Sequence, residues 1–222
     1  MKKIMVLLAL CGSAMWCSGQ GWIQFFEDDS FRPSELVGTN DGGCVVLGFF
    51  DIQPSVKQGI LYRLDQNGVI QWQKVFDFSP PPTVYTQLSV SPNNEILVSG
   101  YRNQSTELVL HKLDNSGNLI WSEVFTDYGL TQYGSADFQF LSTGEIYLHY
   151  LRNDSKYRLQ KLANDGTPIW EELIDWPGVY FNYLVLDELD NILIGGSQTI
   201  NDTNNPAFKK YDPNGNLLFE IV

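Results

Sequence analysis

Short apolar stretches separated by turn residues recur along the chain in groups of four. In the second group they span residues 86–91, 95–101, 107–113 and 119–125. Their length and their Val, Ile, Leu and aromatic content are typical of β-strands. The second stretch of each group is almost continuously apolar, as in Ile192-Leu193-Ile194, which indicates a strand covered on both faces. No stretch beyond the N-terminal segment keeps a helical period, so the pattern predicts an all-β protein.

A glycine followed four positions later by an aromatic residue marks each group. The pairs are Gly68 and Trp72, Gly117 and Trp121, Gly166 and Trp170, and Gly215 and Phe219. Successive glycines are 49 residues apart, and self-similarity at a fixed period of about 20 to 50 residues indicates a repeat architecture. We therefore expect four units that bury their apolar faces against one another, at residues 27–76, 77–125, 126–174 and 175–222.

The turn that contains this glycine has a defined chemistry. Asp65, Asp114 and Asp212 begin three of the turns, and Ala163 takes that position in the third unit. An Asp side chain hydrogen-bonds the backbone ahead of it, and Gly adopts the positive φ of a type I turn with a bulge, so tight hairpins are expected. A calcium loop would need a further acidic ligand that these turns do not fully supply. The indole that follows should lie between two units, with its N–H on a backbone acceptor.

The spacing Asp65-x-x-Gly68-x-x-x-Trp72, repeated from Asp114 to Trp121, resembles the tryptophan-docking repeat of PQQ-like β-propellers. The likeness covers residues 22–222, and residues 41–48 and 113–125 also resemble repeats of secreted bacterial proteins exported by the type IX route. The resemblance implies four four-stranded blades and an extracytoplasmic location. It carries no indication of quinone binding, and we expect no cofactor.

Two features depart from that family. Its propellers usually have more than four blades, and an extra outer-strand pattern at residues 22–26 precedes the first unit. The sequence ends at Val222 within the last outer strand, with no sorting domain after it. Three interpretations stay open: a closed four-blade ring, an open arc that self-associates, and a fragment of a longer propeller.

The N-terminus has the pattern of a secretory signal peptide. Met1-Lys2-Lys3 is basic, residues 4–10 are apolar, and small and polar residues follow. We expect cleavage after Gly19, which gives a leader of residues 1–19 and a domain of residues 20–222, secreted, periplasmic or at the cell surface. The apolar run is shorter than the roughly 20 residues that span a bilayer, so no transmembrane segment is expected.

Charge and cysteine content narrow the functional classes. The formal charge is −12, and an acidic surface repels phosphate backbones, so nucleic acid is not an expected partner. Cleavage of the leader would leave Cys44 as the single cysteine, without an intrachain disulfide. Because Cys44 aligns with Ile96, Ile146 and Ile192, we expect it to be a buried small hydrophobe.

The long connections between strands should emerge at one end of the blades, where loops carried by a rigid scaffold often bind ligands. Acidic and aromatic residues gather after the outer strands, and the candidate ligand-binding residues are Asp28, Asp77, Phe78, Asp127, Tyr128, Asp175, Trp176 and Tyr180. Such a set could hold a sugar or a peptide by stacking and hydrogen bonding. The alternative is that the aromatics cover the ends of the blade cores.

Catalytic chemistry has little support in the sequence. His111 and His149 align with non-titrating residues in other units, no triad is apparent, and no metal site is expected. Basic residues recur in the third strands at Arg63, Lys112, Lys161 and Lys210. They either line a central channel or, as we favour, run between blades with their charges near acidic neighbours.

The sequence therefore favours a secreted, non-catalytic binding or scaffold module whose partner is an extracellular glycan or a protein, with self-association if the ring is open. The alternatives are a carbohydrate-active enzyme that uses two loop carboxylates and a non-functional fragment of a longer propeller.

Overall fold

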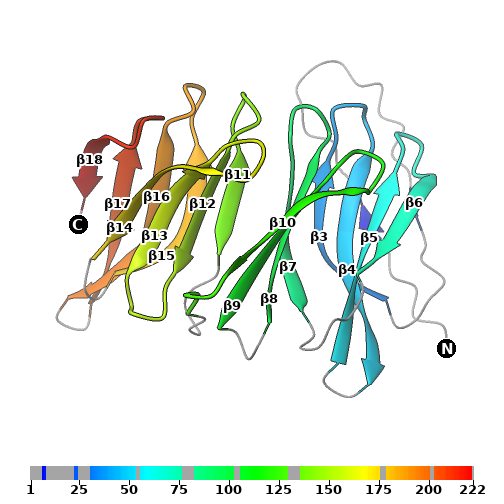
Figure 1. The fold of residues 1–222 in the computed structure, drawn as a ribbon, viewed down its shortest axis with the longest axis horizontal. Coiled ribbons are helices and arrows are strands. Elements are labelled where there is room, and N and C mark those ends of the chain that lie inside the picture. Colours follow the sequence, from blue (N-terminus) through cyan, green and yellow to red (C-terminus); the bar gives the residue numbers. More distant parts are fainter. Residues whose placement is uncertain are drawn as a thin grey trace.

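Four antiparallel sheets of four strands each make up the computed structural model (Figure 1). The structure describes residues 31–53, 56–76, 83–102, 106–129, 136–175, 179–200 and 203–221, together with the two-residue strands β1 (Leu7–Leu8) and β2 (Ile23–Gln24). This part of the chain contains strands and turns and no helix, so the predicted all-β class is confirmed.

The strands of each sheet, here called a blade, follow one another in chain order. Blade 1 contains β3 (Phe31–Gly38), β4 (Cys44–Gln53), β5 (Val56–Leu64) and β6 (Ile70–Val75). Blade 2 contains β7 (Val84–Val90), β8 (Ile96–Arg102), β9 (Glu107–Leu113) and β10 (Leu119–Phe125). Blade 3 contains β11 (Asp137–Phe140), β12 (Ile146–Leu151), β13 (Tyr157–Leu162) and β14 (Pro168–Ile174). Blade 4 contains β15 (Val179–Leu186), β16 (Ile192–Ile200), β17 (Thr203–Tyr211) and β18 (Leu217–Ile221).

The first strands of successive blades lie next to one another. β3 contacts β7, β7 contacts β11, and β11 contacts β15. The blades thus succeed one another with their first strands innermost and their fourth strands outermost (Figure 1). In every blade, the turn between the first and second strands lies at the same end of the sheet as the turn between the third and fourth strands. We call this end of the blades the tight-turn end.

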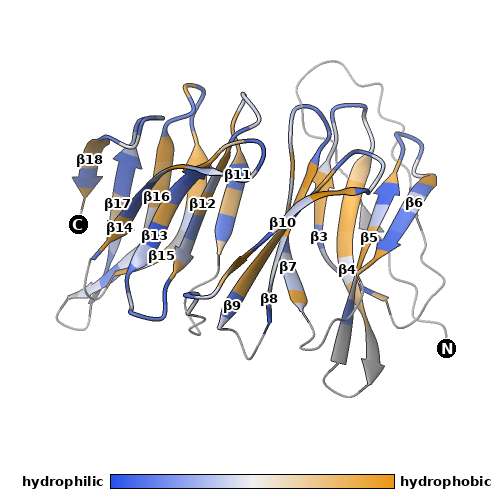
Figure 2. Ribbon diagram, in the orientation of Figure 1, coloured by the Kyte–Doolittle hydropathy of each residue, from blue (hydrophilic) through white to orange (hydrophobic). Residues whose placement is uncertain are grey.

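The apolar cores lie between blades. The face of each blade that packs on the next one is its forward face, and the opposite face is its rear face. At the first junction, Val45 and Leu47 of the forward face of blade 1 share a core with Ile96 and Val98 of the rear face of blade 2. The second strands carry most of this hydrophobic surface, as β4 and β16 show in Figure 2. Cys44 is 2% exposed in a core cluster on the rear face of blade 1, which confirms that it is a buried hydrophobe.

Tryptophans connect the blades at each of the three junctions. The indole Nε1 donates to a carbonyl of the next blade, from Trp72 to Asn115 at 2.9 Å, from Trp121 to Asn164 at 2.9 Å, and from Trp170 to Pro213 at 3.2 Å. Each ring also lies on the turn glycine of that blade. A Cβ atom would sit 3.2 Å from Trp72 at Gly117, 3.2 Å from Trp121 at Gly166 and 3.1 Å from Trp170 at Gly215. The indoles therefore have the contact that the sequence predicts.

Asp side chains close two of the three hairpins that present these glycines, Asp114 at Gly117 and Asp212 at Gly215. Asp114 Oδ1 accepts hydrogen bonds from the backbone N–H groups of Ser116 and Asn118, both at 2.8 Å. Gly117 follows with a φ of 81°, a left-handed conformation that costs glycine little. Because the glycine supplies both the positive φ and the space for an indole, no other residue fits this position equally well.

The described part of the expected extra strand pairs elsewhere. Ile23 and Gln24 of β2 pair with Leu8 and Leu7 of β1, which belongs to the expected leader. The rest of residues 22–26 lies outside the described residues. A chain cleaved after Gly19 would lack this pairing.

We expect Trp121→Ala to lower the free energy of unfolding by about 3 kcal/mol, because it removes an aromatic ring packed between two blades together with its hydrogen bond. Phe219→Ala is the matched control, since Phe219 holds the same repeat position in blade 4 and is 44% exposed. Its loss should stay below about 1 kcal/mol. Equilibrium denaturation by urea measures both, and equal losses would contradict the docking role of the indole.

Gly117→Ala should lower the melting temperature more than Gly42→Ala does. Both glycines have a similar φ, 81° and 84°, so both variants carry the backbone strain of a left-handed alanine. Only at Gly117 does the added methyl group press on an indole; at Gly42 it would lie 3.4 Å from Gln66. Thermal melts of the two variants isolate the indole contact, and an equal fall in melting temperature would show that it contributes nothing.

Candidate functional site

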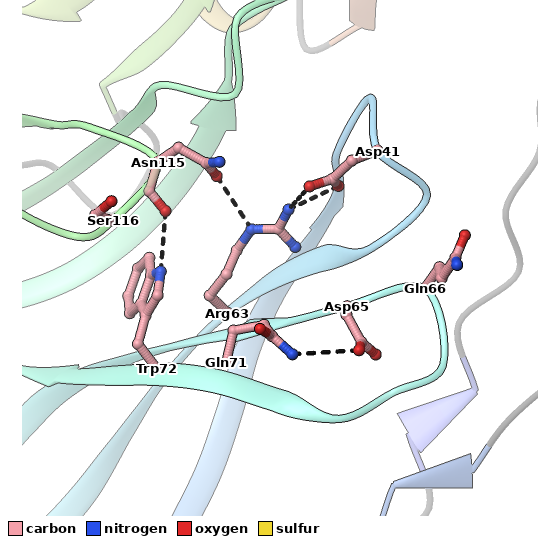
Figure 3. Close-up of a pocket in the computed structure, with 8 residues that line it drawn as sticks. All are labelled: Asp41, Arg63, Asp65, Gln66, Gln71, Trp72, Asn115 and Ser116. Atoms are coloured by element: carbon pink, nitrogen blue, oxygen red, sulfur yellow. Dashed lines mark hydrogen bonds and ion pairs between the residues drawn. The ribbon is translucent and has the colours of Figure 1, made fainter.

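A polar pocket of about 430 Å³ opens between blades 1 and 2 at the tight-turn end (Figure 3). Its walls come from both hairpin turns of blade 1, from strand β6 and from the second hairpin turn of blade 2. The lining residues are Asp41, Arg63, Asp65, Gln66, Gln71, Trp72, Asn115 and Ser116. An indole, amides, carboxylates and a guanidinium therefore surround one space.

Arg63 forms the floor of the pocket and is 4% exposed. Its Nη2 donates to Asp41 Oδ1 at 2.7 Å and also to Oδ2, while Nε donates to Asn115 Oδ1 at 3.4 Å. Nη1 donates to the carbonyls of Leu64 and Cys44. Hydrogen bonds from Thr39 and Arg63 hold the pKa of the Asp41 carboxyl below its usual range. The buried guanidinium thus has a full set of partners and ties blade 1 to blade 2.

The rim of the pocket offers free hydrogen-bonding groups beside the half-buried indole of Trp72. Gln71 Nε2 donates to Asp65 Oδ2 at 3.2 Å, which fixes its amide at the edge of the pocket. Within the described part of the chain, the Gln66 amide and the Ser116 hydroxyl make no hydrogen bond. An aromatic face with amide and hydroxyl groups around it suits a ligand rich in hydroxyl groups.

Two side chains of this junction, Arg63 and Gln71, differ in kind from the residues that the next two repeats share at their positions. The equivalent residues in blades 2 and 3 are Ile120 and Ile169 for Gln71, and Lys112 and Lys161 for Arg63. The tryptophan and the glycine of the docking contact recur, so they are explained by packing. Gln71 and Arg63 are not required by that packing, because isoleucine and lysine serve at the equivalent junctions. Gln71 is absent from the binding residues predicted from sequence, although its departure from an apolar repeat position is a usable signal.

The four third-strand cations bridge turns instead of lining a channel. Each pairs with an acidic residue in or beside the first turn of its own blade: Arg63 with Asp41, Lys112 with Glu95 at 2.9 Å, Lys161 with Glu145 at 2.8 Å, and Lys210 with Asp187 at 2.7 Å. Lys112 Nζ also donates to the Asn164 carbonyl of the next blade at 3.1 Å. The preferred interpretation from sequence, stems between blades with charges on acidic neighbours, is confirmed.

The structure describes four of the eight residues selected at the long-loop end, Asp127, Tyr128, Asp175 and Tyr180. Asp127 pairs with Arg152 and Arg158, both at 3.1 Å, and accepts a hydrogen bond from the Tyr150 hydroxyl. Tyr128 is 2% exposed and packs in the blade core. Elsewhere at this end, Asp175 pairs with Lys156, and Tyr180 is 38% exposed. Asp28, Asp77, Phe78 and Trp176 lie outside the described residues.

The innermost strands place polar side chains together near the axis. Glu35, Gln87 and Asp137 hold equivalent positions of β3, β7 and β11, opposite Leu47, Ser99 and His149 of the second strands. Gln87 Nε2 donates to Asp137 Oδ1 at 3.4 Å, and Asp137 Oδ2 accepts from the Leu184 backbone N–H at 2.8 Å. Gln87 thus connects blade 2 to blade 3, and Asp137 connects blade 3 to blade 4.

Burial changes the acidity of this axial group. It raises the pKa of Glu35 to about 7. The negative charge of Asp137 raises this pKa further, whereas a backbone hydrogen bond from Leu88 lowers it in part. Burial also raises the pKa of Asp137. These carboxyls did not stand out in the sequence because Glu, Gln, Asp and Tyr share the repeat position.

Both histidines are packed in cores. His111 Nε2 lies 2.9 Å from the Tyr85 hydroxyl, and burial, with the charges of Arg102 and Lys74, lowers its pKa to about 4. His149 stacks on Tyr157 with ring centroids 5.1 Å apart, and burial lowers its pKa to about 3. Among the described residues, no group of three His, Cys, Asp or Glu side chains could hold a metal ion.

A search of the described residues for helices long and apolar enough to cross a membrane found none. A scan of protein-family models and a search of curated proteins found no match.

Solved structures match the chain through its fold. The WD40 domain of Toxoplasma gondii coronin has a TM-score of 0.54 at 8% identity, over 84% of this chain and 44% of that one. Prolyl oligopeptidase B from Galerina marginata has a TM-score of 0.55 at 12% identity, over 87% and 27%. A subtype N11 neuraminidase-like protein of A/flat-faced bat/Peru (H18N11) has a TM-score of 0.51 at 12% identity, over 95% and 71%. At these identities the likeness shows the fold alone, and the described chain has the architecture of a β-propeller.

Glu35→Gln should make the protein more stable at pH 8 and leave its stability at pH 4 nearly unchanged. In the folded protein Glu35 keeps its proton up to a pKa of about 7, whereas the unfolded chain releases it near 4.5, so this group favours folding less as pH rises between these values. Allowing for partial solvent screening, the gain at pH 8 should be about 1 to 2 kcal/mol.

Urea denaturation of both proteins at pH 4, 6 and 8 tests this. The difference between variant and wild type isolates Glu35 from the two histidines, whose lowered pKa values act in the opposite direction. A difference that does not change with pH would contradict the raised pKa of Glu35.

Proposed function

We propose that the protein is a non-catalytic binding module that holds a neutral carbohydrate in the pocket between blades 1 and 2. The observation that carries this proposal is the junction itself, where the indole of Trp72 stands beside the amide of Gln71 and the unpaired groups of Gln66 and Ser116. Sugars bind through an apolar ring face and a circle of hydroxyls, and these groups match both parts.

The size of the pocket favours a small ligand. At about 430 Å³ it falls within the range of roughly 300 to 1,000 Å³ typical of small-molecule sites. A protein ligand would instead need a contact surface of about 800 Å² on each partner. One or two sugar rings fit this space better than a folded partner does.

Charge favours a neutral ligand. Arg63 is neutralised by Asp41 at 2.7 Å, and Asp65 adds a further negative charge at the rim. The chain as a whole carries a formal charge of −12. Because an anionic ligand would be repelled by both the rim and the surrounding surface, phosphorylated or sulfated molecules are poor candidates.

The lowered pKa of Asp41 argues against this carboxyl as the general acid of a glycosidase. A glycosidase acid must keep its proton near neutral pH, so its pKa is raised. Asp41 shows the opposite, because Thr39 and Arg63 stabilise its charged form and lower its pKa. The carboxylate closest to the guanidinium is thus an anchor for Arg63 instead of a proton donor.

The N-terminal sequence supports a location outside the cytoplasm for this module, and the repeat supports its type of propeller. Met1-Lys2-Lys3 and the apolar run after it favour export, so the ligand would be met in the periplasm, at the cell surface or outside the cell. The Asp-x-x-Gly-x-x-x-Trp spacing favours a propeller of the PQQ-like type.

A panel of neutral oligosaccharides, screened by isothermal titration calorimetry, should yield a ligand whose affinity depends on Gln71. Gln71→Ile copies the residue of the next two repeats, so the fold should tolerate it. Loss of one or two hydrogen bonds of about 1 kcal/mol each should weaken binding roughly five- to thirtyfold.

Ile120→Ala is the matched control, because Ile120 has the same repeat position in blade 2 and lies outside the pocket. Its affinity should equal that of the wild type. Absence of binding across the panel, or equal loss in Gln71→Ile and Ile120→Ala, would rule out a carbohydrate site in this pocket.

A further inference from the structure

Lys112 of strand β9 is completely buried at the junction between blades 2 and 3, where its amino group contacts both an amide and a carboxylate. Its Nζ donates to the side-chain amide oxygen of Asn164, in the turn before β14, and to the backbone carbonyl of the same residue at 3.1 Å. The Glu95 carboxylate, next to the start of β8, lies 2.9 Å from the same nitrogen. A buried lysine thus meets an asparagine amide and a carboxylate at one point.

The fold holds these three groups in place. Lys112 is paired with Leu97 of β8 on one side and with Trp121 of β10 on the other, so its strand lies inside the sheet of blade 2. The Trp121 indole donates to the Asn164 carbonyl at 2.9 Å, and this docking contact fixes the backbone of the residue that carries the amide. Groups that a rigid scaffold keeps in contact react as if their concentration were very high.

The surroundings of the lysine are apolar. The ring centroid of Phe140 lies 5.8 Å from Lys112 Nζ, and Phe140 is itself a core residue. Charges in such a setting cost free energy, which reduces the advantage of an ion pair over a neutral pair. Because Nζ and the Glu95 carboxylate are in contact, a proton can pass from the ammonium group to the carboxylate. This transfer leaves a neutral, nucleophilic amine beside the amide.

The two other junctions that the structure describes lack this combination. At the junction of blades 1 and 2, Arg63 takes the lysine position and faces Asn115 Oδ1 at 3.4 Å, but a guanidinium does not lose its proton in proteins. At the junction of blades 3 and 4, Lys161 faces the backbone carbonyl of Pro213 at 3.4 Å, where there is no side-chain amide. The packing of blades therefore does not require a lysine beside an asparagine.

We propose that Lys112 and Asn164 join in an intramolecular isopeptide bond, with Glu95 as the proton carrier. The neutral amine attacks Cγ of the Asn164 amide, a carbon–nitrogen bond forms, and an electron pair of the carbonyl moves to Oδ1. Glu95 gives its proton to Nδ2 and takes one from Nζ. The carbonyl then re-forms as the bond from Cγ to Nδ2 breaks, and ammonia leaves through the exposed turn that contains Asn164. The reaction needs no oxidant and no further reactant.

Such a bond would do for this chain what a disulfide does for others. Cys44 is a free, buried cysteine, and the two other cysteines belong to the expected leader. A covalent link between residues 112 and 164 closes a loop across two blades, and a closed loop restricts the unfolded chain and so favours the folded one. The link would also make the docking of Trp121 on blade 3 permanent.

Peptide mapping of the folded wild-type protein by trypsin digestion and mass spectrometry tests the proposal. The peptide that contains Lys112 should be joined to the peptide that contains Asn164, and the joined species should be lighter than the two peptides together by one ammonia molecule. Trypsin should not cut after Lys112, because it requires a free lysine side chain. The joined peptides decide the question, since an N-terminal glutamine such as Gln20 also loses ammonia and would change the mass of the intact protein in the same way.

Three variants assign the roles, and melting temperatures show that each is folded. Lys112→Arg copies the residue of blade 1 and should give no joined peptides. Glu95→Gln keeps the size of the side chain but removes the proton carrier, so it should lower the joined fraction at least about tenfold after equal incubation. Lys161→Arg is the matched control, because Lys161 faces a proline, and it should be joined like the wild type.

A folded wild type that trypsin cuts after Lys112, with no joined peptides, would overturn the proposal and leave the lysine as a paired cation. Joined peptides at the wild-type level in folded Glu95→Gln would overturn the role of Glu95.

Discussion

The docking of an indole onto a glycine of the next blade is the contact on which the rest of the structure depends. It requires a turn that places glycine at a positive φ, a carbonyl in that turn to accept the indole N–H, and an outer strand that carries the ring to it. At Trp72 these parts are Gly117 and the Asn115 carbonyl. Because blades 2 and 3 both receive and donate this contact, its parts must recur at one fixed spacing, which is the 49-residue period of the sequence.

The candidate site arises from this junction. Docking the indole needs only one face and one edge of the ring, so the side chains around it are free to vary. Lysine and isoleucine occupy two of these positions in blades 2 and 3, whereas blade 1 has Arg63 and Gln71. A repeat protein thus provides its own comparison: residues that recur at a junction are accounted for by packing, and residues that depart from the repeat are the ones to examine for binding.

Local chemistry and periodicity were enough to predict the strands, the hairpins and the docking contacts, because each of these depends on residues close together in the sequence. They were not enough to place the pocket, which needs two turns 50 residues apart. The expectation that long loops form the site selected Asp127, whose ion pairs with Arg152 and Arg158 could not be predicted from its position in the sequence. The axial group around Glu35 was also missed, since only the stacking of inner strands brings its members together.

Units of a blade array stabilise one another by mutual cover, so a junction between blades contributes both to the fold and to the surface around it. The pocket between blades 1 and 2 is lined by residues of both blades, and its shape therefore depends on the docking of Trp72 on Gly117. A ligand that contacts both blades binds only when this junction is formed, so its binding would stabilise the folded protein.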